Sequence, residues 1–304
     1  MVDGHLPLLS NTEAVLSCLF FVAVFVGGFY VKSPVSHSAN FSKNDPRVII
    51  HRIKCVLVAC IVSPLYLYML LSYKGYFNQK NSFLELLNIL GLSYRSAITS
   101  IVSSLLIVAA LFLGPLVLAA LDQELPFQSQ FNFTADVLET VTSLSGFRNF
   151  IFGPIAEEFI FRSCMVPVYH FAGFSPSITV LCLPLYFGAA HIHHAIAVYY
   201  KTRSLRGALI GAGICQLNAF QFFYCTVFGM LATFLFSRTS SIYGPVASHT
   251  FCNIMGFPDL SGPKRYPKHR TLLWISLIGG VFLFSLILYP LTSPQWFSSM
   301  YWAE

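Results

Sequence analysis

Three ionisable residues lie within the otherwise apolar segment GPIAEEFIFRSC, residues 153–164. Glu158 and Arg162 are four residues apart, so on a helix they can form an ion pair that lowers the cost of burying either charge. Glu157 is turned by about 100° from Glu158 and cannot share that arginine equally well. This spacing makes Glu157 a candidate general base, the alternative being a protonated side chain that only stabilises helix packing.

Two later apolar segments carry polar residues at helical spacing. Phe187 precedes His191 by one turn in FGAAHIHH, and His249 and Asn253 share one helix face in SHTFCNIMG. We interpret Glu157 and His191 as the groups that activate a water molecule, and His249 and Asn253 as donors to an oxyanion. This chemistry is peptide hydrolysis without a covalent intermediate.

Other catalytic chemistries have weaker support in the sequence. No HExxH zinc motif is present, although His191, His193 and His194 could gather a metal with Glu157. Cys164 and Cys252 lie in apolar runs that do not activate a thiol, and no GxSxG motif occurs. We therefore predict no metal and no cofactor, and zinc catalysis stays open as an alternative.

The composition is that of a membrane protein. Of 304 residues, 56% are hydrophobic and 10% charged, whereas a soluble domain has about 25% charged residues. Four apolar stretches are long enough to cross a bilayer, and four more in the second half contain polar residues. The first four are 14–31, 55–73, 97–121 and 271–291, and the others are 148–165, 176–192, 207–236 and 241–257.

These stretches predict an all-α, polytopic helix bundle with about eight transmembrane helices. We expect a single membrane domain over residues 1–304, with a polar catalytic cavity in its second half and a catalytic core at about 140–257. Lysine and arginine concentrate in the loops 32–54, 201–206 and 264–270, which the positive-inside rule places in the cytosol. The net charge of +6 is explained by these loops, so we predict no nucleic-acid partner.

Three motifs in this order resemble those of the type II CaaX prenyl protease family. They are Glu157-Glu158-x-x-x-Arg162, Phe187-x-x-x-His191 and His249-x-x-x-Asn253. The resemblance implies a metal-free, glutamate-type intramembrane protease that uses Glu157 and His191 on water and His249 with Asn253 as the oxyanion hole. Glu158, Arg162 and Phe187 would support the site.

The resemblance also implies a substrate and a location. The expected substrates are farnesylated or geranylgeranylated CaaX proteins, such as Ras-type small GTPases, which lose their last three residues at the endoplasmic reticulum membrane. A cavity open to both lipid and cytosol would suit a prenyl chain and a soluble tail. The alternatives are a proton- or ion-coupled transporter and a catalytically silent scaffold.

Overall fold

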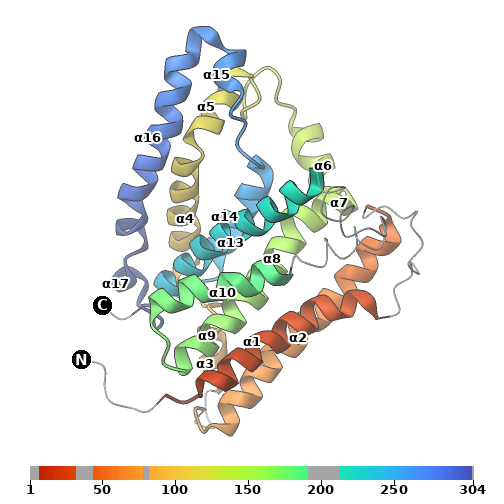
Figure 1. Cartoon of the computed structure of the whole chain (residues 1–304), viewed down its shortest axis with the longest axis vertical. Helices are drawn as coiled ribbons and strands as arrows, with labels where there is room; N and C mark the ends of the chain where they lie inside the picture. The colour runs from red at the N-terminus through yellow and green to blue at the C-terminus, as the bar shows by residue number, and fades with distance from the viewer. Residues whose placement is uncertain (1–6, 32–43, 78–81, 191–212, 303–304) are drawn as a thin grey trace.

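The computed structural model describes residues 7–31, 44–77, 82–190 and 213–302, and within these ranges every regular element is helical (Figure 1). This confirms the predicted all-α fold. The α-helices are α1 (Asn11–Gly27), α2 (Pro46–Tyr73), α3 (Ser82–Ile89), α4 (Ala97–Leu111), α5 (Leu113–Leu121), α6 (Thr140–Thr142), α7 (Leu144–Gly146), α8 (Gly153–Glu158), α9 (Met165–Phe171), α10 (Pro176–Ala190), α13 (Gly213–Thr239), α14 (Tyr243–Met255), α15 (Gly262–Arg265), α16 (Arg270–Leu288) and α17 (Pro294–Phe297).

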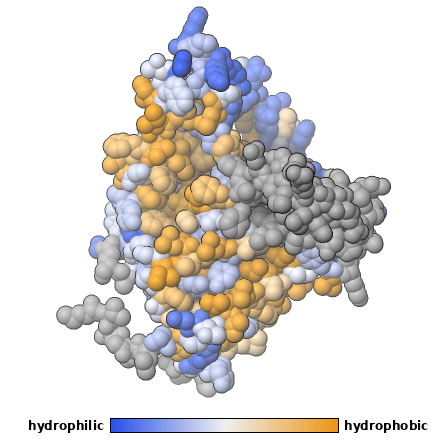
Figure 2. All heavy atoms as spheres, viewed as in Figure 1, coloured by the Kyte–Doolittle hydropathy of each residue, from blue (hydrophilic) through white to orange (hydrophobic). Residues whose placement is uncertain are grey.

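Apolar side chains cover much of the outer surface of the long helices. Four helical segments of the described chain are long and apolar enough to span a membrane: Asn11–Tyr30, Pro46–Tyr73, Ser82–Leu111 and Pro267–Leu288. On α16, Ile275, Ile278 and Phe282 are each more than 60% exposed, an arrangement that lipid tolerates and water does not. Figure 2 shows apolar atoms over the middle of one face and hydrophilic atoms towards its two ends. The protein is thus a polytopic membrane protein, and the number of eight spans stays a prediction.

The predicted span 97–121 is divided into two helices. The chain leaves helical geometry at Phe112, where φ is −91° and ψ is 17°. Pro115 explains the break, because it has no amide hydrogen and its ring excludes the carbonyl group of Leu111, four residues earlier. The helix α16 packs against both α4 and α5, so the two pieces still form one side of the bundle (Figure 1).

The segment that contains the glutamates alternates between α and π turns. The π-helical segments Phe147–Phe152 and Phe159–Cys164 lie on either side of α8. In the first of them, the amide of Gly153 donates to the carbonyl of Arg148, five residues earlier, so Asn149 loses its usual partner. The next residue, Pro154, has no amide hydrogen to give to Phe150. Side chains of another helix donate to these two carbonyl groups.

That helix is α14, and its own position depends on small residues. The backbone amide of Gly244 donates to Ser100 Oγ of α4 at 3.1 Å. A Cβ atom at position 244 would lie 2.4 Å from Ser104 Oγ, so only glycine allows this approach. Close packing of small residues is typical of membrane helices. It places α14 so that its polar face meets the π-helical segment.

An aromatic row connects the first helix to the second half of the chain. The ring of Phe161 lies 5.3 Å from that of Phe25 on α1 and 5.0 Å from that of Phe187 on α10. All three side chains are buried in one hydrophobic core. Since α1 also packs against α2 (Figure 1), this core brings the first two helices beside the segment that carries Glu157 and Glu158.

Candidate active site

The ion pair between Glu158 and Arg162, which their spacing predicted, is present and fully buried. Arg162 Nη1 donates to Glu158 Oε1 at 3.0 Å, and the side chains are 1% and 0% exposed. Such a pair loses the hydration of both charges, so it depends on further contacts.

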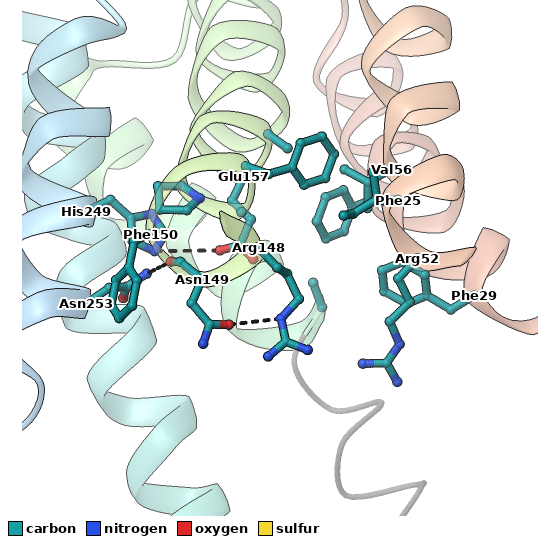
Figure 3. A pocket seen from close by; sticks show the side chains of 16 residues that line it. Phe25, Phe29, Arg52, Val56, Arg148, Asn149, Phe150, Glu157, His249 and Asn253 are labelled. Atoms are coloured by element: carbon teal, nitrogen blue, oxygen red, sulfur yellow. Dashed lines mark hydrogen bonds and ion pairs between the residues drawn. The ribbon is translucent and has the colours of Figure 1, made fainter. Parts of the chain in front are cut away.

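His249 connects the two glutamates. Its Nδ1 atom lies 2.6 Å from Glu158 Oε1, and because an ionised carboxylate only accepts, Nδ1 carries the hydrogen. The other ring nitrogen, Nε2, lies 3.8 Å from Glu157 Oε2 (Figure 3), which is too long for a direct hydrogen bond. His249 and Glu157 thus face the same cavity, where a water molecule to one side of them could hydrogen-bond to both.

The structure places a histidine beside Glu157 that the sequence had not paired with it. We expected Glu157 to work beside His191 and to lack a local partner. His191, together with His193 and His194, lies outside the described residues. Within the described chain, the histidine that approaches Glu157 is His249, a residue that the spacing paired only with Asn253.

Two aromatic rings enclose the buried cation and the histidine. The guanidinium carbon of Arg162 lies 4.6 Å from the Phe187 ring and 5.9 Å from the Phe228 ring. The Phe228 ring is also 4.8 Å from the imidazole of His249. Contacts of a guanidinium with aromatic faces contribute about 0.5–1 kcal/mol at exposed sites and about 2 kcal/mol or more when desolvated. Phe187 therefore lies where a supporting residue is expected, and Phe228 is a second one that the sequence did not reveal.

Gly229 allows this enclosure to close. A Cβ atom there would lie 2.9 Å from Pro184 Cβ and 3.2 Å from Arg162 Nη2. Glycine is thus required where α13 approaches both α10 and the buried arginine. The only sequence signal was a phenylalanine followed by a glycine in an apolar run, which is too common in membrane helices to identify a site.

Asn253 contacts the site from the same face of α14. Its Nδ2 atom donates to the backbone carbonyl of Asn149 at 2.9 Å, and Thr250 Oγ1 donates to that of Phe150 at 3.0 Å. These are the two carbonyl groups whose usual donors, four residues later, are lost to the π turn and to Pro154. The amide of Asn253 has a second hydrogen, and its side chain lines the same cavity as Glu157.

The site opens into a cavity of about 470 Å³ between the first two helices, the π-helical segment and α14 (Figure 3). Glu157, His249 and Asn253 line it, whereas Glu158 and Arg162 are buried behind them. The first two helices were predicted only as spans, yet they supply part of the wall. Their lining residues are Phe25, Phe29, Arg52, Ile53 and Val56.

The described residues contain no group of three or more His, Cys, Asp or Glu side chains that could hold a metal ion. The histidines of the zinc alternative fall outside those ranges, so its ligand set is not tested. Cys164 lies in the hydrophobic core, and neither it nor Cys252 lines the cavity.

Comparisons with known proteins match this chain to CAAX prenyl proteases. The family model described as "Type II CAAX prenyl endopeptidase Rce1-like" matches residues 139–255. The human protein CAAX prenyl protease 2 is 33% identical over 98% of this chain and 87% of its own length. CAAX prenyl protease 2 of Arabidopsis thaliana is 29% identical over 94% of this chain and 91% of its own length. Probable CAAX prenyl protease 2 of Schizosaccharomyces pombe is 30% identical, with 88% and 90% covered. No solved structure matches the chain significantly.

Proposed function

This chain belongs to the type II CAAX prenyl endopeptidase family, and on that premise we propose that it removes the C-terminal tripeptide of prenylated CaaX proteins with an activated water molecule. The observation that carries the mechanism is the convergence of Glu157, His249 and Asn253 on one cavity, with the Glu158–Arg162 pair behind them. The catalytic core at about 140–257 is part of the proposal, supported by the family match over 139–255.

Glu157 is the proposed general base. Its carboxylate accepts a proton from water, assisted by His191, while the water oxygen forms a bond to the carbonyl carbon of the prenylcysteine. The C–N bond then breaks, and the proton passes to the amine of the leaving tripeptide. The products are a prenylcysteine carboxylate on the protein and a free tripeptide.

His249 and Asn253 are the proposed oxyanion donors. With Nδ1–H bonded to Glu158, the Nε2 atom of His249 faces the cavity, and a proton there can be donated to the tetrahedral oxyanion. The second Nδ2 hydrogen of Asn253 can donate from the same helix face. Glu158 and Arg162 act as positioning residues, because Glu158 Oε1 contacts Nδ1 of His249 and also accepts from Nη1 of Arg162.

We propose the substrate and the location from the family and from the lining of the cavity. Phe25, Phe29 and Val56 form an apolar side that suits a farnesyl or geranylgeranyl chain. Ras-type small GTPases are the proposed substrates, and the endoplasmic reticulum membrane, with the cavity open to the cytosol, is the proposed site of action. The basic loops of the sequence support that orientation.

The test uses the purified full chain in detergent with a farnesylated CaaX peptide. Tripeptide release is followed by mass spectrometry for the wild type, Glu157→Gln and the control Glu139→Gln, whose side chain is exposed and outside the cavity. We expect release by the wild type and the control, unchanged by a chelator, and none by Glu157→Gln. No release from folded wild-type protein would refute the activity, and loss on chelation would favour zinc.

The same experiment distinguishes a protease from a catalytically silent scaffold and from a transporter. A scaffold would keep its cellular function with Glu157→Gln, whereas a protease would lose it. Substrate cleavage by a purified protein in detergent micelles, where no gradient exists, would not be expected of a transporter.

A further inference from the structure

Two arginines from distant parts of the chain line the cavity. Arg52 belongs to α2 and Arg148 to the π-helical segment before α8. The Arg52 guanidinium carbon lies 5.4 Å from the Phe29 ring. Arg148 donates to the side-chain oxygen of Asn149 at 2.9 Å and to that of Asn44 at 3.2 Å. These contacts orient the two guanidinium groups towards the cavity.

The two cations share one end of the cavity. In Figure 3 both guanidinium groups lie at the lower end, away from Phe25 and Val56, with Glu157 and His249 above them. Glu157 is the only carboxylate among the described lining residues, and the proposed mechanism uses it on water. Two like charges held at one end of a partly apolar cavity favour an anionic ligand there.

The chemistry of the ligand follows from the donor type. A guanidinium presents a planar fork of N–H groups that matches a carboxylate, and such charge-assisted pairs are stronger than neutral hydrogen bonds. A CaaX substrate ends in one such group, the α-carboxylate of its last residue.

We propose that Arg52 and Arg148 bind the C-terminal carboxylate of the substrate and so set the position of the bond that is cut. The inference rests on the proposed function, since it concerns the tripeptide that this function releases. Both residues would be specificity-determining residues at the end of the cavity away from Phe25 and Val56.

The distances along the chain agree with this role. Three residues in extended conformation span about 10 Å. Arg148 precedes Glu157 by nine residues, which is at most about 13 Å at the α-helical rise of 1.5 Å per residue, because part of this stretch is π-helical and rises less. A carboxylate held by the arginines therefore brings the peptide bond after the prenylcysteine to the level of Glu157 and His249. By binding the terminal carboxylate, the two arginines would place the bond three residues from the end of the substrate at the catalytic groups.

A lipid phosphate has related chemistry and could occupy the same cations. The test distinguishes the two sources with farnesylated peptides that differ only in their last group, a free carboxylate or a carboxamide. Initial rates give kcat/KM for the wild type, Arg52→Gln, Arg148→Gln and Lys54→Gln. Lys54 is the matched control, because it lies on α2 close to Arg52 but is exposed and outside the cavity.

We expect the wild type and Lys54→Gln to prefer the free carboxylate by about 10- to 100-fold in kcat/KM, the usual size of a hydrogen bond to a charged group. Arg52→Gln and Arg148→Gln should lose most of this preference by slowing only on the carboxylate peptide. Arg52→Lys keeps the charge without the fork, so it should be intermediate. Unchanged cleavage of the carboxamide also shows that each variant is folded.

Three results would overturn the inference. Equal cleavage of both peptides by the wild type would show that the enzyme does not recognise the terminal carboxylate. The proposed protease activity would still be supported. An equal loss on both peptides in the arginine variants would assign the arginines to lipid phosphate or to the fold. Failure of folded wild-type protein to cleave either peptide would instead refute the proposed function, and the inference with it.

Discussion

Replacing Arg162 with methionine removes one half of a fully buried charge pair. Arg162 is 1% exposed and Glu158 is 0% exposed, with 3.0 Å between Nη1 and Oε1. Methionine is apolar and adaptable in shape, so it can occupy much of the space beside Phe187 and Phe228. The variant therefore chiefly tests the charge and creates only a small void.

The expected cost comes from the carboxylate that remains. Glu158 keeps its hydrogen bond from His249 but loses its permanent cation, and breaking a buried pair from one side costs about 3–5 kcal/mol. The double variant Glu158→Gln/Arg162→Met also removes the stranded charge, so it should recover part of this loss. We expect a coupling energy of at least about 2 kcal/mol from the double-mutant cycle.

The assay is reversible unfolding in mixed micelles with increasing sodium dodecyl sulfate, followed by circular dichroism. The control is Arg265→Met. The Arg265 side chain is 48% exposed, and its Nη2 atom lies 2.6 Å from Oδ2 of Asp122, whose side chain is 18% exposed. Loss of this partly exposed pair should cost about 1 kcal/mol or less. The reasoning is refuted if Arg162→Met is no more destabilising than Arg265→Met, or if the coupling energy is near zero.

Three further variants probe other contacts. Asn253→Ala should lower kcat by about 10²- to 10³-fold with little change in KM, as expected for an oxyanion donor; a change confined to KM would contradict this role. Gly229→Ala should reduce both stability and activity, since its Cβ would lie 2.9 Å from Pro184 and 3.2 Å from Arg162; wild-type melting and rate would show that the site can yield. Gly91→Ala should lower the melting temperature but not the rate per folded molecule, because φ is +68° and the new Cβ would lie 2.8 Å from the Phe236 ring. An unchanged melting temperature would argue against strain at this turn.

The sequence alone was sufficient to predict contacts and shared faces between residues of the same helix. Helix geometry places residues i and i+4 on one face, so the Glu158–Arg162 pair and the shared face of His249 and Asn253 could be predicted from spacing alone. The length and apolarity of the stretches near the ends of the chain likewise predicted membrane helices, because the thickness of a bilayer sets how many residues a span needs.

Contacts between helices were decided only by the tertiary structure. His249 meets Glu158, 91 residues away, because Gly244 lets α14 approach α4 and because the π turn leaves carbonyl groups that Asn253 and Thr250 satisfy. The enclosure of Arg162 by Phe228 likewise depends on how α13 packs, and spacing within one helix carries no information on that packing. The cavity lies among several helices, and Arg52 and its neighbours on the first two helices form part of its wall. No single stretch of sequence could predict that part of the wall, because it exists only once these helices pack together.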